Sequence, residues 1–399
     1  MPQNLRASIA FLVFLALTVP SAPGAEVAST DSRLFVSTDS VAAAPDKAAL
    51  ERTVRAAVAP FVAKGKYVGL VVGVFDRGTS VIVSYGRKNK DAPGAPDSRT
   101  LFEIGSVTKV FTATVLAILV DRGEVHLDDS VNTLLPPPMA MPPAVAGDLT
   151  LLHLATHTSG LPRVPASLIA SGPTDDPYSQ YSPRDLSRCL ASVELESRPG
   201  ATYSYSNLGV GLLGFLLAQK EKTSYESLVT ALVSKPLGMN DTCITLSDDQ
   251  NSRLAAGHTV TTILPSVSIF AKTSSWHFTD CFAGAGALRS TADDMLRFVA
   301  ASLGYGDSPL VPLLKRTHEP RFEVRDSLHI GLAWHISGKA PAEEVVVWHN
   351  GATGGYYSYV ALREKSGLGV VVLTNCTTGV EPIGAAVTNA VLASRPKTD

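Results

Sequence analysis

The feature that most constrains the fold of this sequence is that its β-rich runs lie near its two ends. Residues 67–86, YVGLVVGVFDRGTSVIVSYG, hold two such runs around an Asp-Arg-Gly turn, which predicts a hairpin. Residues 343–375 hold three more runs separated by HNGATGG and EKSG, which predicts an antiparallel three-stranded meander. Isolated hairpins are only marginally stable, so we expect all five strands to pair in one sheet.

Helical patterns flank and separate these strands. Residues 46–65 carry apolar side chains at helical spacing, and residues 383–394 predict a last helix. The middle of the chain is richer in helical patterns and in Pro/Gly loops. We expect an α/β fold: an antiparallel sheet of at least five strands, flanked by N- and C-terminal helices, with a mainly helical inserted region. The predicted domain covers 45–396, with its sheet region at 45–105 and 300–396 and its helical region at 106–299.

The N-terminus is typical of an export signal. Arg6 is followed by the apolar run IAFLVFLALTV and by the small-residue segment PSAPGA, which predicts a signal peptide over residues 1–25. The apolar run is short for a bilayer span. A membrane anchor or a buried N-terminal helix is the alternative. Cleavage would leave a periplasmic or secreted protein without a transmembrane anchor.

The composition argues against a nucleic-acid partner. Hydrophobic residues make up 45% of the chain and charged residues 18%, so a large core can be buried. The formal net charge is −2, and Lys and Arg form no basic block. Nucleic-acid binding needs such a cluster, so we expect none.

The cysteine and histidine spacing argues against a metal site. Cys189, Cys243, Cys281 and Cys376 show no C-x-x-C pair, and no H-E-x-x-H motif is present. We therefore expect no metal and no cofactor. In an oxidising compartment Cys243 could pair with Cys281; the alternative is four small buried hydrophobic residues. His153 and His157 have i, i+4 spacing without a third ligand, so we expect a structural role for their segment.

The stretch FEIGSVTKVF sets Ser106 three residues before Lys109 at a predicted helix start. Residues 110–120 are apolar nearly all round, which predicts a helix buried in the core. At i, i+3 spacing Lys109 can reach Ser106, and burial would lower the lysine pKa so that it can accept the serine proton. Alternatively the pair is an ordinary helix start. S-x-x-K alone is a weak signal, since SRPK near the C-terminus also matches.

A second candidate element is Tyr205-Ser206-Asn207, just before a Gly-interleaved apolar helix. A tyrosine beside a lysine can shuttle a proton, and an asparagine side chain can hold a substrate amide. The alternative is a buried aromatic residue with a helix-capping asparagine.

A third candidate element is WHNGATGG, at the end of a predicted strand. His349 could transfer a proton or bind an anionic group, and Gly351 allows a ligand to approach the backbone closely. The amide of Ala352 could then serve in an oxyanion hole. The alternative is a glycine-rich turn with an incidental histidine.

Together the S-x-x-K, Y-x-N and H-x-G elements resemble the active-site signature of the class C β-lactamase and D,D-carboxypeptidase superfamily. The resemblance covers about residues 50–395 and implies a serine β-lactamase-like fold. LTLLHLATHTSGLPR, KPLGMNDT and GAGALRSTADDMLRFVAASL resemble non-catalytic signatures of its carboxypeptidase and esterase branches.

The resemblance also implies a role for each site residue. Ser106 would be the acylated nucleophile, Lys109 would activate it, and Tyr205 would act as general base and acid. Asn207 would orient the substrate amide, and His349 would face the substrate carboxylate. The backbone amides of Ser106 and Ala352 would form the oxyanion hole beside Gly351. Whether Lys109 or Tyr205 first accepts the serine proton stays open.

Two departures from the family pattern stand out. His349-Asn350-Gly351 occupies the place of Lys-Thr-Gly in typical class C β-lactamases, and a histidine there resembles D,D-peptidases, D-aminopeptidases and esterases. Efficient β-lactam hydrolysis is therefore less expected. Ser130-Val131-Asn132 matches an S-x-N motif of other penicillin-binding proteins, but we interpret it as a connecting loop.

The expected function is an exported serine hydrolase that forms an acyl-Ser106 intermediate with β-lactams or D-alanyl-D-alanine-type peptides. The alternatives are a carboxylesterase or acyltransferase of the same fold, and a penicillin-binding sensor that is acylated without turnover. Three aromatic residues could line the substrate cleft or merely pack: Tyr178, Tyr181 and Trp276.

Overall fold

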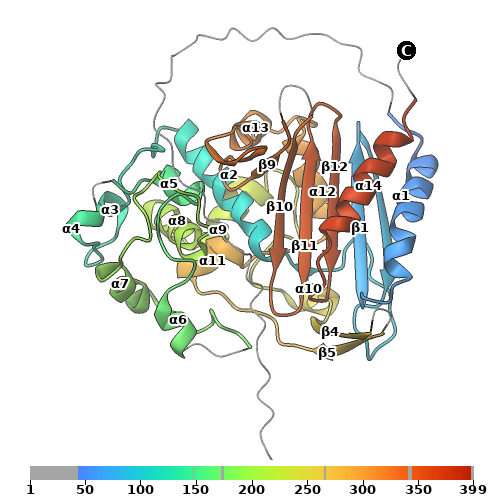
Figure 1. The fold of residues 1–399 in the computed structure, drawn as a ribbon, viewed down its shortest axis with the longest axis horizontal. Helices are drawn as coiled ribbons and strands as arrows, with labels where there is room; N and C mark the ends of the chain where they lie inside the picture. The colour runs from blue at the N-terminus through green and yellow to red at the C-terminus, as the bar shows by residue number, and fades with distance from the viewer. Residues whose placement is uncertain (1–43, 147, 172–174, 265–266, 340–343, 397–399) are drawn as a thin grey trace, which may run out of the picture. The chain divides into compact units, whose positions relative to one another are not determined.

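The computed structural model describes residues 44–146, 148–171, 175–264, 267–339 and 344–396. The predicted signal peptide at residues 1–25 lies outside this range. In the described chain, eight strands form one sheet in the order β2-β1-β12-β11-β10-β9-β8-β7 (Figure 1). Each strand runs antiparallel to its neighbours. The strands are β1 (Gly69–Asp76), β2 (Thr79–Gly86), β7 (Phe322–Arg325), β8 (Leu328–Ile330), β9 (His335–Ser337), β10 (Val346–Ala352), β11 (Tyr357–Arg363) and β12 (Leu368–Thr374).

The sheet joins the two ends of the chain, as the sequence predicts. β1 and β2 form the expected hairpin, and β10, β11 and β12 form the expected meander. β1 pairs with β12 along its length, from Leu70 opposite Thr374 to Asp76 opposite Leu368. The sequence did not predict β7, β8 and β9, because these strands are only three or four residues long and partly polar.

Two helices cover one face of the sheet, and both were predicted. They are α1 (Lys47–Val62) and α14 (Glu381–Ala393), which lie side by side in Figure 1. Leu50, Val54 and Val58 of α1 recur every four residues and are buried against the sheet.

The opposite face carries the larger core. The buried helices here are α2 (Thr108–Asp121), α8 (Asn207–Lys220), α11 (Asp280–Gly286) and α12 (Ala292–Ser302). Every residue of α2 from Thr108 to Leu119 is buried, which confirms the prediction of a central helix. α8 and α11 approach closely because glycines meet: a Cβ on Gly214 would lie 2.9 Å from Gly284 Cα. These helices hold the candidate site against β10.

Shorter elements complete the described chain. The helical ones are η1 (Gly105–Val107), α3 (Val131–Leu134), α4 (Pro143–Ala146), α5 (Leu151–Ala155), α6 (Ala166–Ser171), α7 (Pro183–Ala191), α9 (Tyr225–Val229), η2 (Thr230–Ser234), α10 (Asp248–Arg253) and α13 (Val311–Thr317). The remaining strands are the pair β3 (Phe102–Glu103) and β6 (Arg289–Ser290), and the hairpin β4 (His258–Leu264) and β5 (Val267–Lys272). Among the described helices, none combines the length and apolarity needed to cross a membrane.

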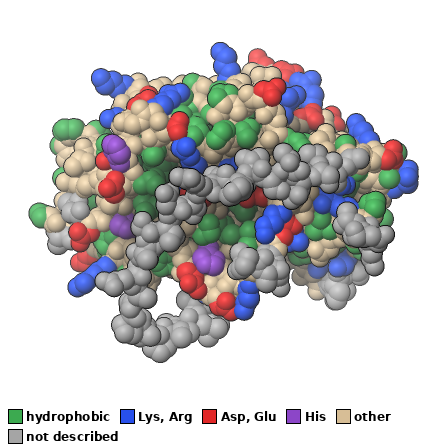
Figure 2. Space-filling view, turned by 90° about the horizontal axis from the view of Figure 1, so that it is seen from above, with side chains coloured by type: hydrophobic (Ala, Val, Ile, Leu, Met, Phe, Trp, Pro, Cys, Tyr) green, Lys and Arg blue, Asp and Glu red, His purple; other side chains and the backbone are tan. Residues whose placement is uncertain are grey.

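The surface carries mixed charge. On the face drawn in Figure 2, the described Lys and Arg side chains lie among Asp and Glu side chains rather than in one continuous basic stripe. This distribution agrees with the small net charge of the sequence.

The four cysteines are unpaired thiols, so of the two alternatives the disulfide between Cys243 and Cys281 is wrong. Cys281 is buried in α11, whereas Cys243 is half-buried and its thiol contacts the carbonyl of Asp241 at 3.6 Å. Burial raises the pKa of Cys243 to about 11 and that of Cys281 to about 12, so both stay protonated at neutral pH. The alternative expectation holds in part, because Cys189 and Cys243 are only half-buried.

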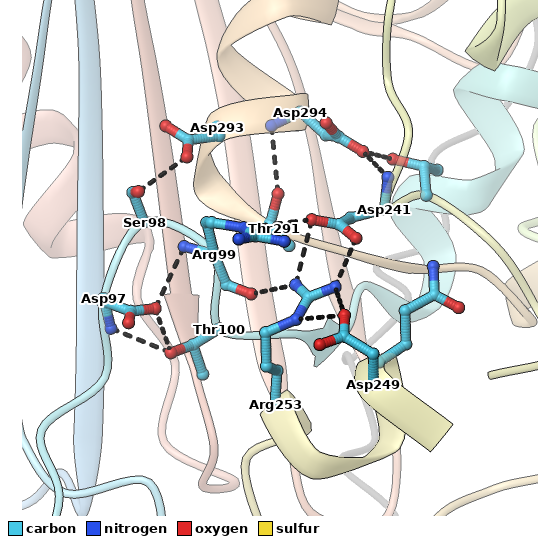
Figure 3. Close-up of polar contacts among 12 residues, drawn as sticks. Asp97, Ser98, Arg99, Thr100, Asp241, Asp249, Arg253, Thr291, Asp293 and Asp294 are labelled. Carbon is cyan, nitrogen blue, oxygen red and sulfur yellow. Dashed lines mark hydrogen bonds and ion pairs between the residues drawn. The ribbon is translucent and has the colours of Figure 1, made fainter. Parts of the chain in front are cut away.

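A polar cluster beside the sheet ties α10 to distant segments (Figure 3). Arg253 makes a two-pronged ion pair with Asp241, at 2.5 and 3.0 Å. It also contacts Asp249 at 2.8 Å and donates to the carbonyl of Arg99 at 2.8 Å. Through Arg253, these bonds connect the segment just before β3, which contains Arg99, with the loop before α10, which contains Asp241.

We expect Arg253→Ala to lower the free energy of unfolding by about 2–3 kcal/mol, because it removes the two-pronged partner of the partly buried Asp241 carboxylate and leaves it only the longer contact with Arg99 at 3.8 Å. Arg55→Ala is the matched control, since the ion pair of Arg55 with Glu51 is exposed and should contribute less than about 0.5 kcal/mol. Urea denaturation of both variants measures the difference. Equal midpoints would show that the Arg253 cluster is not stabilising.

Candidate active site

Ser106 lies in η1, a short 3-10 turn, and not at the first turn of the α-helix as expected. The preceding Gly105 has φ +48°, a left-handed conformation that favours glycine. A Cβ on Gly105 would lie 2.8 Å from the backbone nitrogen of Ala352 on β10. The turn therefore holds the half-buried Ser106 directly against β10, with α2 beginning two residues later.

Lys109 is fully buried and points at Ser106. Its Nζ lies 3.0 Å from Ser106 Oγ, 2.9 Å from Asn207 Oδ1 and 2.6 Å from the carbonyl oxygen of Ala285. Burial lowers the pKa of Lys109 well below 10.5, and the positive charge of Arg163 lowers it further. A neutral amine can donate its two N–H groups to the two carbonyl oxygens. Its lone pair is then free to accept the serine proton.

Asn207 begins α8 and does not cap it. The cap is Ser206, whose hydroxyl accepts from the backbone N–H of Gly209 at 2.9 Å, so the alternative of a helix-capping asparagine is wrong. The Asn207 side chain instead spans the site: Oδ1 accepts from Lys109, and Nδ2 donates to the Tyr178 hydroxyl at 3.0 Å. Tyr178, whose role the sequence left open, therefore belongs to the site.

Tyr205 lies beside the lysine. The Lys109 Nζ is 4.9 Å from the centroid of its ring. Burial raises the pKa of Tyr205, and its hydrogen bond with Ser106 only partly opposes this shift. At neutral pH Tyr205 is therefore a neutral phenol, which can donate a proton more readily than it can accept one from serine.

His349 is buried on β10. Its Nδ1 contacts the carbonyl of Asn350 at 2.6 Å, and its Nε2 has no hydrogen-bond partner among the described residues. Burial lowers the pKa of His349 well below 6.5, and His335 and Lys109 lower it further. His349 is thus a neutral ring inside the protein.

Gly351 and Ala352 form the wall of β10 that faces Ser106. A Cβ on Gly351 would overlap the carbonyl of Ile104 and lie 2.9 Å from the backbone nitrogen of Ser106. Only glycine fits this approach. The amides of Ser106 and Ala352 thus belong to two chain segments in direct contact, as a two-amide oxyanion hole requires.

His157 holds Tyr205, a contact that the sequence did not predict. Its ring centroid is 4.3 Å from that of Tyr205. Its Nδ1 accepts from the backbone N–H of Ser206 at 3.1 Å, and its carbonyl accepts from that of Ser204 at 2.8 Å. His157 therefore fixes the backbone on both sides of Tyr205, whereas the His153 side chain accepts from the backbone N–H of Thr150, the N-cap of α5. The sequence predicted a structural role for this segment, but the i, i+4 spacing gave no signal of the contact with Tyr205.

We expect His157→Asn to lower kcat about tenfold with little change in KM, because Tyr205 loses its ring contact. Asparagine tolerates the φ of +57° at this position and offers an acceptor to Ser206. His157→Leu should lose more, since it removes that acceptor and disfavours this conformation. The control is His153→Asn, which should match the wild type in steady-state kinetics. An unchanged kcat in both His157 variants would refute the positioning role.

Two further residues missed by the sequence analysis extend the site. Tyr203 contacts His335 Nε2 through its hydroxyl at 2.9 Å, and the ring of His335 lies 5.3 Å from that of His349. Burial lowers the pKa of His335 to about 4, so it too is neutral at pH 7.

The S-x-N stretch at residues 130–132 makes structural contacts outside the candidate site. It does not form a simple loop as expected: Val131–Leu134 is a one-turn helix. Asn132 Oδ1 accepts from the backbone N–H of Met141 at 3.2 Å, which gives this asparagine a structural contact.

Comparison with known proteins places the chain in a family. The Beta-lactamase family matches residues 54–393. The D-alanyl-D-alanine-carboxypeptidase/endopeptidase AmpH of Escherichia coli is 27% identical over 318 residues, 76% of this chain and 78% of the relative. A β-lactamase of Pseudomonas fluorescens is 28% identical over 363 residues, 82% of this chain and 93% of the relative.

Solved structures agree with this match. A class C β-lactamase superposes with a TM-score of 0.75 at 23% identity, covering 89% of this chain and 99% of its own. The β-lactamase/D-alanine carboxypeptidase of Pseudomonas syringae superposes with a TM-score of 0.72 at 25% identity, covering 87% and 100%. This chain therefore belongs to the Beta-lactamase family and has the serine β-lactamase fold.

Proposed function

We propose that this protein is an exported serine hydrolase that forms an acyl-Ser106 intermediate with D-alanyl peptides or β-lactams. The observation that carries the proposal is the buried Lys109, whose Nζ lies 3.0 Å from Ser106 Oγ and also contacts two carbonyl oxygens, and whose pKa burial lowers well below its ordinary value. The names of the relatives, a D-alanyl-D-alanine-carboxypeptidase/endopeptidase and a β-lactamase, support the substrate class. Export rests on the signal predicted at residues 1–25.

In the proposed acylation, Lys109 accepts the Ser106 proton as Oγ attacks the substrate carbonyl carbon. The amides of Ser106 and Ala352 stabilise the negative oxygen of the tetrahedral intermediate. Tyr205 donates its phenolic proton to the leaving nitrogen as the C–N bond breaks, and the Lys109 ammonium returns a proton to the phenolate. Asn207 orients the substrate amide while it holds the lysine in place.

Deacylation reverses these proton transfers. Lys109 accepts a proton from water, which attacks the acyl carbonyl carbon, and passes it to Ser106 Oγ as the acyl–oxygen bond breaks and the carboxylic acid leaves. Ser106 regains its proton, so the site returns to its starting charge.

A second candidate is a carboxylesterase that uses the same serine. The observation that favours it is the neutral, buried His349, which supplies no positive charge from β10 to a substrate carboxylate.

A single set of assays separates these functions. Mature protein is incubated with a fluorescent penicillin, and intact mass follows the adduct, with nitrocefin, a D-Ala-D-Ala peptide and p-nitrophenyl acetate as substrates. We expect an adduct on Ser106 together with hydrolysis of the peptide or of nitrocefin. Hydrolysis of p-nitrophenyl acetate alone, without an adduct, would support the esterase. A permanent adduct without any turnover would contradict both and support a sensor.

A further inference from the structure

Arg163 places an exposed positive charge beside the catalytic residues. Its backbone carbonyl accepts the N–H groups of Asn207 at 2.9 Å and Leu208 at 3.2 Å, which fixes Arg163 at the start of α8. Its guanidinium carbon lies 5.1 Å from the centroid of the Tyr205 ring. The side chain therefore extends along the partly exposed side of the site, where Ser106 is also accessible.

This guanidinium has no carboxylate partner among the described residues, whereas the arginines of the polar cluster in Figure 3 are paired with aspartates. An exposed Arg gains little from the face of one aromatic ring, about 0.5–1 kcal/mol. A planar guanidinium fork matches a carboxylate with two parallel hydrogen bonds. The fork of Arg163 is thus available for an anionic ligand.

Two other ionisable groups near Ser106, Lys109 and His349, are not available to bind an anionic ligand. Lys109 is buried, and its N–H groups already contact Asn207 and Ala285. His349 belongs to β10 and is fully buried, and its Nδ1 contacts the backbone carbonyl of Asn350. Among the described residues that contact Tyr205, Arg163 is therefore the exposed fixed cation.

We propose that Arg163 binds the substrate carboxylate and so selects anionic substrates over neutral ones of the same shape. This inference rests on the proposed function, because D-alanyl-D-alanine peptides and β-lactams both carry a carboxylate near the reacting carbonyl. It assigns to the loop between α5 and α6 the anion-binding role that the sequence had suggested for His349.

The test uses matched substrates that differ only in charge. The first pair is diacetyl-lysyl-D-alanyl-D-alanine and its C-terminal amide; the second pair is nitrocefin and its methyl ester. For wild-type protein we expect kcat/KM to favour the acid by about 10- to 100-fold, the size of a charge-assisted hydrogen-bonded pair. Arg163→Gln should reduce this ratio at least tenfold, and Arg163→Lys should restore part of it.

Arg52→Gln on α1, across the sheet from the site, is the matched control and should keep the wild-type ratio. Thermal melting of Arg163→Gln should equal that of the wild type, because the backbone contacts of residue 163 remain. If the wild type turns over both members of a pair and the ratio survives in Arg163→Gln, the inference is overturned and the proposed function stands. If the wild type turns over neither member of either pair, the proposed function fails, and the inference with it.

Discussion

Ser106→Ala protein should form no adduct with a penicillin and should lose kcat by about 10⁴- to 10⁶-fold, as expected when a catalytic nucleophile is removed. The loss should be this large because Oγ is the atom that Lys109 reaches at 3.0 Å, and the part of the chain that the structure describes offers no second serine at that amine. The Ser106 side chain is small and only half-buried, so the variant should melt close to the wild-type temperature.

Ser394→Ala is the control for this result. Ser394 has the same S-x-x-K spacing in the sequence, but its hydroxyl donates to the carbonyl of Val391 at 2.8 Å. Intact mass after incubation with a penicillin, and kcat on the best substrate, should be unchanged in this variant. An adduct that persists in Ser106→Ala would identify another nucleophile and contradict the proposed mechanism.

Lys109→Met should lower kcat/KM by about 10²- to 10⁴-fold, the usual contribution of a general base. Methionine fills much of the buried space of the lysine stem but cannot accept the Ser106 proton. In the wild type, kcat/KM should rise with pH through the lowered pKa of Lys109, because only the neutral amine is a base. In the variant, the residual kcat/KM should not show this rise with pH. A pH–rate profile of both proteins measures the difference.

The same pKa shift predicts how stability changes with pH. Between the lowered pKa of folded Lys109 and its ordinary value of 10.5, the unfolded chain binds more protons than the folded one. The free energy of unfolding should therefore gain a positive contribution as pH rises through this window, and Lys109→Met should lack it. Urea denaturation at several pH values measures the slope. Identical slopes in the two proteins would mean that Lys109 is charged in the folded state and cannot be the base.

The fold was largely predictable because its main signals are local. Runs of β-branched residues mark β1, β2 and β10–β12, and regular apolar spacing marks α1 and α14. Strands of three or four residues, such as β7–β9, carry too few side chains to show a pattern. The thiol states of the cysteines could not be read from spacing either, because they depend on which segments meet.

The sequence by itself determined the proximity of Ser106 and Lys109, because three residues along one helical turn always bring two side chains together. It also indicated that a sheet built from both chain ends would surround a helical middle. Only the tertiary structure decided that His349 is a buried neutral ring, that His157 holds Tyr205, and that the exposed Arg163 lies over the Tyr205 ring. The reason is physical: burial, charge and ring contact are set by segments that are distant in sequence and meet only when the core packs.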